Sequence, residues 1–299
     1  MKVYLTGAHG FFGSNVARAF AGHGAALVCP RSSEVDVTDA RAVRRSVRDA
    51  APDAIVHCAI LNDFGRLYTD RRAARSAYVD ATRNVVDAAN EAGARVVLVS
   101  TDWVFDGTQG GATEDEPPNP INAYGFLKAA SELVVAERAD RGAVARISGV
   151  QGLHRARPDT PRRQDAGFGY FVASLVDALR ADRPFTVWES PDINTVATPT
   201  LASDAAEALW RMLVREREGI HHCCGREAVS RRELAQRAVE VFGLDPGLLR
   251  FGPPELDALP GPVPFDTSLD ASATVAALEL EAPDLTTQLE RLRAELTGA

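Results

Sequence analysis

The sequence predicts an α/β fold in which a doubly wound parallel sheet is joined to a smaller, interleaved C-terminal α/β region. Two observations lead to this prediction. Short runs rich in β-branched residues alternate with longer segments whose apolar residues recur at helical spacing, as expected for strands joined by crossover helices. The short runs are also almost continuously apolar, which is typical of strands whose sheet is covered by helices on both faces.

The elements of the first half follow one another in a regular order. Strands are expected at residues 2–6, 26–29, 54–58, 95–100 and 142–147. Helical patterns occupy residues 11–24, 39–50 and 78–93, and glycines at 22, 24 and 93 lie where these helices should stop. Residues 1–150 are therefore expected to form one unit, whose sheet is completed by parts of 190–245.

The second half changes character after about residue 150. A loop rich in proline and arginine is expected at 151–167, followed by helices at 170–181, 201–214 and 230–243, strands at 185–189 and 219–224, and a last helix at about 285–297. Ser230 and Glu233 form the capping-box pattern that starts a helix. Residues 151–299 are expected to form mainly a second, smaller unit.

Composition excludes several classes of protein. The net charge of −8 argues against a general nucleic-acid-binding protein, and no apolar run is long enough to span a bilayer. The amino-terminal residues do not resemble a signal peptide, and the four cysteines have no metal or redox spacing, so a cytoplasmic location is expected. His154, His221 and His222 show no metal-ligand spacing either, and no metal site is expected.

The segment TGAHGFFG places three glycines between the first strand and the first helix. A helix amino terminus presents unpaired N–H groups and the positive end of the helix dipole, and glycines let a phosphate approach the backbone closely. This position predicts binding of a dinucleotide pyrophosphate. The expected cofactor contacts from this segment are Gly7, His9, Gly10, Phe11, Phe12 and Gly13.

The end of the second strand bears on the choice between NAD and NADP. An acid there commonly binds the ribose 2′-hydroxyl of NAD, whereas an arginine can pair with the 2′-phosphate of NADP. Arg31, followed by Ser32, favours NADP(H), while Glu34 nearby weakens the charge argument and keeps NAD(H) as an alternative. Further cofactor contacts are expected from Asp36, Val37, Cys58 and Ala59.

Tyr124 and Lys128 stand four residues apart and share one face of a helix. The lysine is informative, because only two of the 33 basic residues, Lys2 and Lys128, are lysines. A compact ammonium can contact a ribose hydroxyl and lower the pKa of a neighbouring phenol, which a planar guanidinium does poorly. Thr101 leaves the end of a central strand, where parallel sheets place ligand-binding groups. These residues predict a site that transfers a proton to a carbonyl oxygen beside the cofactor, which Tyr124 and Lys128 also contact.

The glycine segment, the strand-end threonine and YGFLK together resemble the extended branch of the short-chain dehydrogenase/reductase superfamily. Within that branch, STDWVFDG, EDEPPNPINAYGFLKAASE, TPT at 198–200 and GIHHCCG resemble the dTDP-4-dehydrorhamnose reductase family. The resemblance covers most of the chain and is best over 1–147. It implies a Rossmann-type NADP(H)-binding domain at 1–150 and a domain at 151–299 that mainly binds a nucleotide sugar.

By this resemblance, Thr101, Tyr124 and Lys128 form the catalytic triad, and Asp102 and Trp103 face the substrate. The implied reaction is hydride transfer from the nicotinamide to the 4-keto group of a nucleotide-linked deoxysugar. Tyr124 would protonate the alkoxide, Thr101 would polarise the carbonyl, and Lys128 would orient the ribose. Members of the superfamily often form dimers, so a homodimer is one expectation.

Two features depart from the family. Gly149 stands where the family commonly has a bulky aromatic residue that meets the sugar, so a reshaped pocket is expected. The loop that follows contains Arg155, Arg157, Arg162 and Arg163, which form either a solvated surface or an anion-binding site. Arg155 and Arg157 are the expected substrate contacts.

Other functions remain open. One is an epimerase, a dehydratase or a reductase of another carbonyl compound. Dehydration typically requires a pair of acid–base carboxylates beside the tyrosine; Asp102 could be one, but the expected neighbouring glutamate is absent. Another is a non-catalytic, NADP-binding regulatory subunit, since the β subunit of methionine adenosyltransferase resembles the same family.

Overall fold

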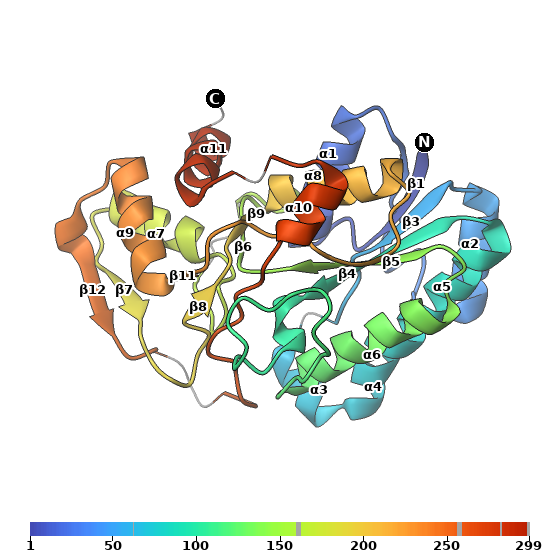
Figure 1. Ribbon diagram of the computed structural model, residues 1–299, viewed down its shortest axis with the longest axis horizontal. Coiled ribbons are helices and arrows are strands. Elements are labelled where there is room, and N and C mark those ends of the chain that lie inside the picture. Colours follow the sequence, from blue (N-terminus) through green and yellow to red (C-terminus); the bar gives the residue numbers. More distant parts are fainter. Residues whose placement is uncertain (62, 160–162, 256–258, 282, 298–299) are drawn as a thin grey trace.

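The computed structural model describes residues 1–61, 63–159, 163–255, 259–281 and 283–297. Within them, a six-stranded sheet of parallel strands forms the centre of the larger part of the molecule (Figure 1). Its strands, in spatial order, are β2 (Ala26–Val28), β1 (Lys2–Thr6), β3 (Ala54–His57), β4 (Arg95–Thr101), β5 (Gly142–Ile147) and β10 (Gly219–His222). The predicted parallel α/β sheet is confirmed.

The strand order reverses between β1 and β3. The chain passes from β1 outward to β2 and then returns to β3 on the other side of β1. Crevices at the carboxyl ends of strands beside such a reversal are where open parallel sheets bind ligands. The segments that leave β1, β2, β3 and β4 at this edge carry many of the predicted site residues, and α6 carries Tyr124 and Lys128.

Helices cover both faces of the sheet. On one face lie α1 (Phe11–Gly22) and α8 (Ala202–Val214), and on the other lie α2 (Ala40–Ala50), α5 (Ala81–Ala92) and α6 (Ala123–Arg138). Side chains alternate between the two faces along each strand. In β1, Val3 and Leu5 pack with α1 and α8, whereas Tyr4 packs with α2 and α5.

The helix predicted at 78–93 has a more complex beginning. Two short helices, α3 (Phe64–Thr69) and α4 (Arg71–Arg75), lead into a π-helical turn, η1 (Ser76–Asp80), which continues directly into α5. Asp63 and Asp70 cap the short helices by accepting hydrogen bonds from backbone N–H groups. The π-helical turn brings Tyr78 toward α6, where the candidate site lies.

The residues after β5 build a smaller region around its own apolar core, on the left of Figure 1. Its helices are α7 (Phe171–Arg180), α9 (Arg231–Phe242) and α11 (Leu285–Thr297), and the expected capping box at Ser230 and Glu233 is present. Its strands form short pairs: β6 (Val150–Gln151) with β9 (Thr200–Leu201), β8 (Val196–Ala197) with β11 (Val229–Ser230), and β7 (Phe185–Trp188) with β12 (Leu249–Gly252).

Several of these elements were not predicted. The strands β6, β8, β9, β11 and β12 and the helix α10 (Ser272–Leu278) are too short for a periodic pattern to reveal them. The 3-10 turns η2 (Asp102–Val104) and η3 (Pro246–Leu248) complete the described elements. Across the described ranges, the structure contains no helix with the length and apolar character needed to cross a lipid bilayer.

Candidate active site

The glycine loop between β1 and α1 is shaped by what lies next to it. Gly7 has a φ of 70°, and a Cβ there would lie 2.7 Å from the backbone nitrogen of Ala59. A Cβ at Gly13 would overlap the backbone oxygen of Gly7, so side chains are excluded at both positions. Gly10 caps α1 without any side-chain hydrogen bond to the first turn. The loop therefore forms a bare backbone cradle at a helix amino terminus, which fits a pyrophosphate.

The other residues of this loop point in different directions. The ring of Phe11 lies 4.7 Å from that of Tyr170 and 6.2 Å from that of His154, so it joins the loop to the smaller region. Phe12 packs against the core beneath α1, and His9 is partly buried. The structure therefore gives Phe11 and Phe12 packing contacts in addition to their predicted place beside a cofactor.

The segment after β2 presents an exposed arginine beside a tethered acid. Arg31, Ser32 and Asp36 are exposed. The carboxylate of Glu34 accepts a hydrogen bond from the backbone N–H of Arg31 at 2.7 Å, which holds the acid locally. The carbonyl of Val37 accepts a hydrogen bond from the Asn84 side chain at 3.0 Å. The Arg31 side chain thus lies at the surface, where a 2′-phosphate could reach it.

Tyr124 and Lys128 lie on α6 and face the end of β4. The ammonium of Lys128 is buried, donates to the carbonyl of Val99 at 2.8 Å and lies 6.0 Å from the centre of the Tyr124 ring. Thr101 ends β4 and lies beside the Tyr124 side chain, whose pKa it acts to lower. Tyr78 packs its ring edge-to-face on Tyr124, with the ring centres 6.0 Å apart. The structure thus brings the three predicted catalytic residues together.

Burial sets the charge states in this group. It raises the pKa of Tyr124 to about 12, and the neighbouring Thr101 acts to lower it. It lowers the pKa of Lys128 to about 8, while Cys58 and Glu132 act to raise it. Because burial also raises the pKa of Cys58 to about 12, that thiol is neutral near pH 7. The carboxylate that supports the charge of Lys128 at this pH is therefore Glu132.

The Asp102 side chain is enclosed by protein donors, and its predicted contact with the substrate stays a prediction. Its side chain is 5% exposed. One carboxylate oxygen accepts the hydroxyl of Thr101 at 2.9 Å, and the other accepts those of Ser148 at 2.8 Å and Thr267 at 2.6 Å. Both oxygens are thus occupied by protein donors. The carboxylate also takes the single hydroxyl hydrogen of Thr101, which leaves the threonine oxygen as an acceptor.

Trp103 forms an aromatic wall beside the tyrosine. Its ring is edge-to-face with those of Phe64 and Tyr124, at 6.0 Å between centres in both cases. Gly125 allows this approach, because a Cβ there would overlap the backbone oxygen of Trp103. Partly buried and next to Tyr124, Trp103 lies where a substrate ring could contact it.

The arginine-rich loop is only partly available to a ligand. Arg155 forms an ion pair with Glu295 at 2.7 Å and donates to the Asn15 side chain at 3.3 Å, so it is already engaged within the protein, and its predicted contact with the substrate stays a prediction. Arg157 and Arg163 are exposed. Arg162 lies outside the described residues.

Gly149 meets a backbone requirement. Its φ is 48°, in the left-handed region that favours glycine. A Cβ there would lie 3.2 Å from Pro199 and 3.4 Å from the side chain of Phe168. A bulky residue at this position would therefore need a different backbone, and the space that an aromatic side chain would fill is bordered by Phe168 instead.

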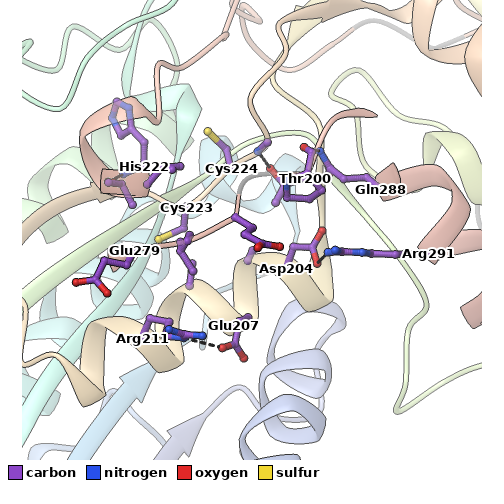
Figure 2. A pocket seen from close by; sticks show the side chains of 18 residues that line it. Thr200, Asp204, Glu207, Arg211, His222, Cys223, Cys224, Glu279, Gln288 and Arg291 are labelled. Atoms are coloured by element: carbon purple, nitrogen blue, oxygen red, sulfur yellow. Dashed lines mark hydrogen bonds and ion pairs between the residues drawn. The ribbon is translucent and has the colours of Figure 1, made fainter. Parts of the chain in front are cut away.

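A separate hollow of about 330 Å³ lies between α8, α10 and the start of α11 (Figure 2). At its wall, Asp204 pairs with Arg291 at 2.8 Å and Glu207 with Arg211 at 3.0 Å. Among the described residues that line it, none was predicted to bind the cofactor or the substrate. The candidate active site is therefore the edge formed by the glycine loop, the end of β4 and the start of α6.

Residues 1–297 match a family described as the RmlD substrate binding domain. The chain belongs to this family. The match spans both regions of the molecule, so the smaller region is as much a part of the RmlD substrate binding domain as the sheet is. The predicted resemblance to dTDP-4-dehydrorhamnose reductases of the extended short-chain dehydrogenase/reductase type is confirmed.

Proteins similar to this chain include some named as subunits of an enzyme and some named as reductases. Methionine adenosyltransferase 2 subunit beta of Xenopus tropicalis is 28% identical, over 91% of this chain and 80% of that protein. A dTDP-4-keto-6-deoxy-D-glucose reductase of Streptomyces niveus is 27% identical, over 82% and 80%. A crystal structure of dTDP-4-dehydrorhamnose reductase from Bacillus anthracis with NADP has a TM-score of 0.84 at 22% identity and covers 98% of this chain and 99% of that one.

Sequence reasoning missed a set of buried polar residues behind the site of this RmlD-family chain. His57 at the end of β3 hydrogen-bonds Thr6 at 2.7 Å, and burial, with the charge of Lys128, lowers its pKa to about 3. Glu132 and Arg146 form an ion pair of 2.8 Å with side chains 5% and 0% exposed. For Glu132 a signal was available, because it continues the four-residue spacing of Tyr124 and Lys128 along the same helix.

Proposed function

We propose that the protein uses NADPH to reduce the 4-keto group of a nucleotide-linked deoxysugar. The observation that carries this proposal is the convergence of Thr101, Tyr124 and Lys128 at the carboxyl end of β4, beside the glycine cradle. The protein is an NAD(P)-dependent oxidoreductase that interconverts C–OH and C=O groups. Its named reductase relative supports a sugar nucleotide as substrate.

The residues of this chain fit a nicotinamide dinucleotide. The cradle of Gly7, Gly10 and Gly13 would hold its pyrophosphate, and Lys128 its ribose. When bound, the nicotinamide supplies the hydride for the ketone. The exposed Arg31 supports a preference for the 2′-phosphate of NADP, although Glu34 is tethered next to it.

Tyr124 is the proton donor in this proposal. With its pKa raised to about 12, it is protonated near neutral pH and can hydrogen-bond a ketone oxygen. As the proton leaves, the buried ammonium of Lys128 stabilises the phenolate that forms. Thr101 donates its only hydrogen to Asp102 at 2.9 Å, so we assign it to shaping the strand end beside Tyr124, in place of the predicted polarisation of the carbonyl, and the Tyr124 hydroxyl is assigned to the ketone oxygen.

Asp102 supports reduction over dehydration. A catalytic acid must present a proton to the substrate, whereas this carboxylate accepts hydroxyls at both oxygens and is 5% exposed. In this role Asp102 fixes the orientation of Thr101, and Trp103 is the nearer candidate for contact with the sugar ring. Arg157 and Arg163, which are exposed, remain candidates for the diphosphate.

A second candidate is a cofactor-binding regulatory subunit without turnover. It is favoured by the relatives named methionine adenosyltransferase 2 subunit beta, which align with most of this chain. In that case NADPH would bind to the glycine cradle, but no ketone would be reduced. The two candidates differ in a single measurable quantity, the rate of NADPH oxidation.

The test follows the absorbance of NADPH and NADH with dTDP-, GDP- and UDP-linked 4-keto-6-deoxy sugars. We expect turnover with one nucleotide class, and kcat lower by roughly 10²- to 10⁴-fold in Tyr124→Phe. Tyr78→Phe is the matched control, because it removes a phenol that packs against Tyr124 but bonds the carbonyl of Leu61. Tight NADPH binding without turnover of any sugar would favour the regulatory subunit.

A further inference from the structure

The buried pair of Glu132 and Arg146 joins α6, the helix that carries Tyr124 and Lys128, to β5. Glu132 accepts three hydrogen bonds from the guanidinium of Arg146, at 2.8 Å from Nη2 and at 3.1 and 3.3 Å from Nε, and another from the hydroxyl of Ser100. The two charged side chains are 5% and 0% exposed. A buried pair of this kind contributes little net stability compared with apolar residues of the same volume, so its presence invites another explanation.

Strand register places this pair in a row across the sheet. Ser100 on β4 lies opposite Arg146 on β5, and Arg146 lies opposite His222 on β10. His222 faces the carbonyl of Asp270 through Nδ1 at 2.8 Å, so its Nε2 lone pair faces Arg146 at 3.4 Å. The guanidinium also lies 5.0 Å from the centre of the Phe105 ring. The row therefore fixes Arg146 from three sides and, through it, the carboxylate of Glu132.

Glu132 in turn stands one helical turn from Lys128, which stands one turn from Tyr124. The groups that face Lys128 from the surrounding elements are Tyr78, Tyr124, His57, Cys58 and Glu132. Near neutral pH the two phenols, the imidazole and the thiol are uncharged. The carboxylate is thus the charged partner of the ammonium among these groups.

We propose that Glu132, clamped by Arg146 and Ser100, is a positioning residue that holds α6 in register with β4 and keeps the Lys128 ammonium charged beside Tyr124. This inference deepens the proposed reductase function and rests on it for the catalytic consequence. The effect of Glu132 on the charge of Lys128 and on the position of α6 can be measured without a substrate.

The test uses the fact that the chain has two lysines. Protein grown with lysine carrying carbon-13 at Cε gives one signal each for Lys2 and Lys128, and Lys2→Arg assigns them. We expect the Lys128 signal to titrate near pH 8, and about one pH unit lower in Glu132→Gln. Asp87→Asn is the matched control, since it breaks a 2.8 Å ion pair to Arg138 on the same helix but away from Lys128.

The pH dependence of kcat/KM and the variant Glu132→Asp provide two further measurements. In Glu132→Gln, the basic limb of the pH profile of kcat/KM should move by the same amount as the signal, and Glu132→Asp should recover part of the shift. If Glu132→Gln does not fold, Glu132→Gln with Arg146→Met removes the pair together, and the signal should still move to lower pH. An unchanged Lys128 titration in a folded variant overturns the proposal. A shifted titration without sugar turnover in wild-type protein leaves it standing and rejects the reductase function.

Discussion

Two buried arginines, one in each region of the molecule, are held in different ways. Arg146 in the sheet region and Arg231 in the smaller region are both 0% exposed, and each guanidinium lies 5.0 Å from the centre of a phenylalanine ring. Arg146 is neutralised by a carboxylate, that of Glu132. Arg231 donates instead to the backbone carbonyls of Asn194, Asp165 and Gly167.

The difference shows in the electrostatics and in what each residue organises. Burial lowers the pKa of Arg231 to about 10, against a smaller opposing effect of the Asp165 carboxylate. Its partners lie on two loops, so it ties loop backbones to the start of α9. Arg146 ties a helix to a strand through side chains alone. In the sheet region the buried arginine is paired with a carboxylate on α6, whereas in the smaller region the buried arginine holds two loops in place.

Replacing Arg146, which is paired with the Glu132 carboxylate, should reduce the stability of the protein most. Arg146→Met leaves the Glu132 carboxylate buried without its counter-ion, and the free energy of unfolding should fall by about 3–5 kcal/mol. Urea unfolding followed by circular dichroism measures this loss. Adding Glu132→Gln to the same protein should restore part of the stability, because no unpaired charge then remains. If the double variant is as unstable as the single one, the lost stability comes from packing, and the unpaired Glu132 carboxylate does not explain it.

Replacing Arg231, which donates to backbone carbonyls, should reduce the stability of the protein less. Arg231→Met leaves backbone oxygens without donors and removes a cation that lowers the pKa of the buried Asp165 carboxylate. Because the hydrogen bonds that are lost go to backbone carbonyls, we expect a loss of about 2–3 kcal/mol. The same urea titration gives the value. Limited proteolysis should also show faster cleavage near residues 163–167, which the guanidinium holds. A loss larger than that of Arg146→Met would contradict the ranking.

A third test concerns a buried base that stays neutral. The pKa of His57 in the folded protein is about 3, below its usual value of 6.5, so its contribution to stability is present above pH 6.5 and is lost as the pH falls toward 3. His57→Asn should make the dependence of unfolding free energy on pH shallower in that window, by up to about 1.4 kcal/mol per pH unit. Urea midpoints at several pH values measure the slope. An unchanged slope would mean that His57 takes up its proton without unfolding.

The predictability of the two regions also differs. The sheet strands, the glycine loop and the Tyr124–Lys128 spacing follow from patterns within a few residues of one another, and all were found in the sequence. The two-residue strands β6 and β9 pair across about fifty positions, and no local pattern marks them. Their formation depends on tertiary packing, which sequence periodicity does not report.

The site shows the same division. The meeting of Thr101 with Tyr124 could be anticipated, because strand ends and the following helix share one edge of a parallel sheet. The enclosure of Asp102 could not, since Thr267 lies 165 residues away along the chain. The ion pair of Arg155 could not be anticipated for a similar reason: its partner Glu295 lies on the last described helix. A charged residue in a predicted loop gives no sign, in the sequence around it, of a partner 140 positions away along the chain.

The hydroxyl of Thr267 on Asp102 has a consequence for the order in which the protein is made. A ribosome releases Thr101, Tyr124 and Lys128 long before it reaches Thr267, and during that interval a buried carboxylate at the strand end lacks one of its donors. The first five strands of the sheet, β1 to β5, are therefore synthesised while this corner of the candidate site is still incomplete, and β10 follows later. Completion of the candidate active site is in this sense a late event of synthesis, timed by the arrival of a segment that contributes no strand to the six-stranded sheet.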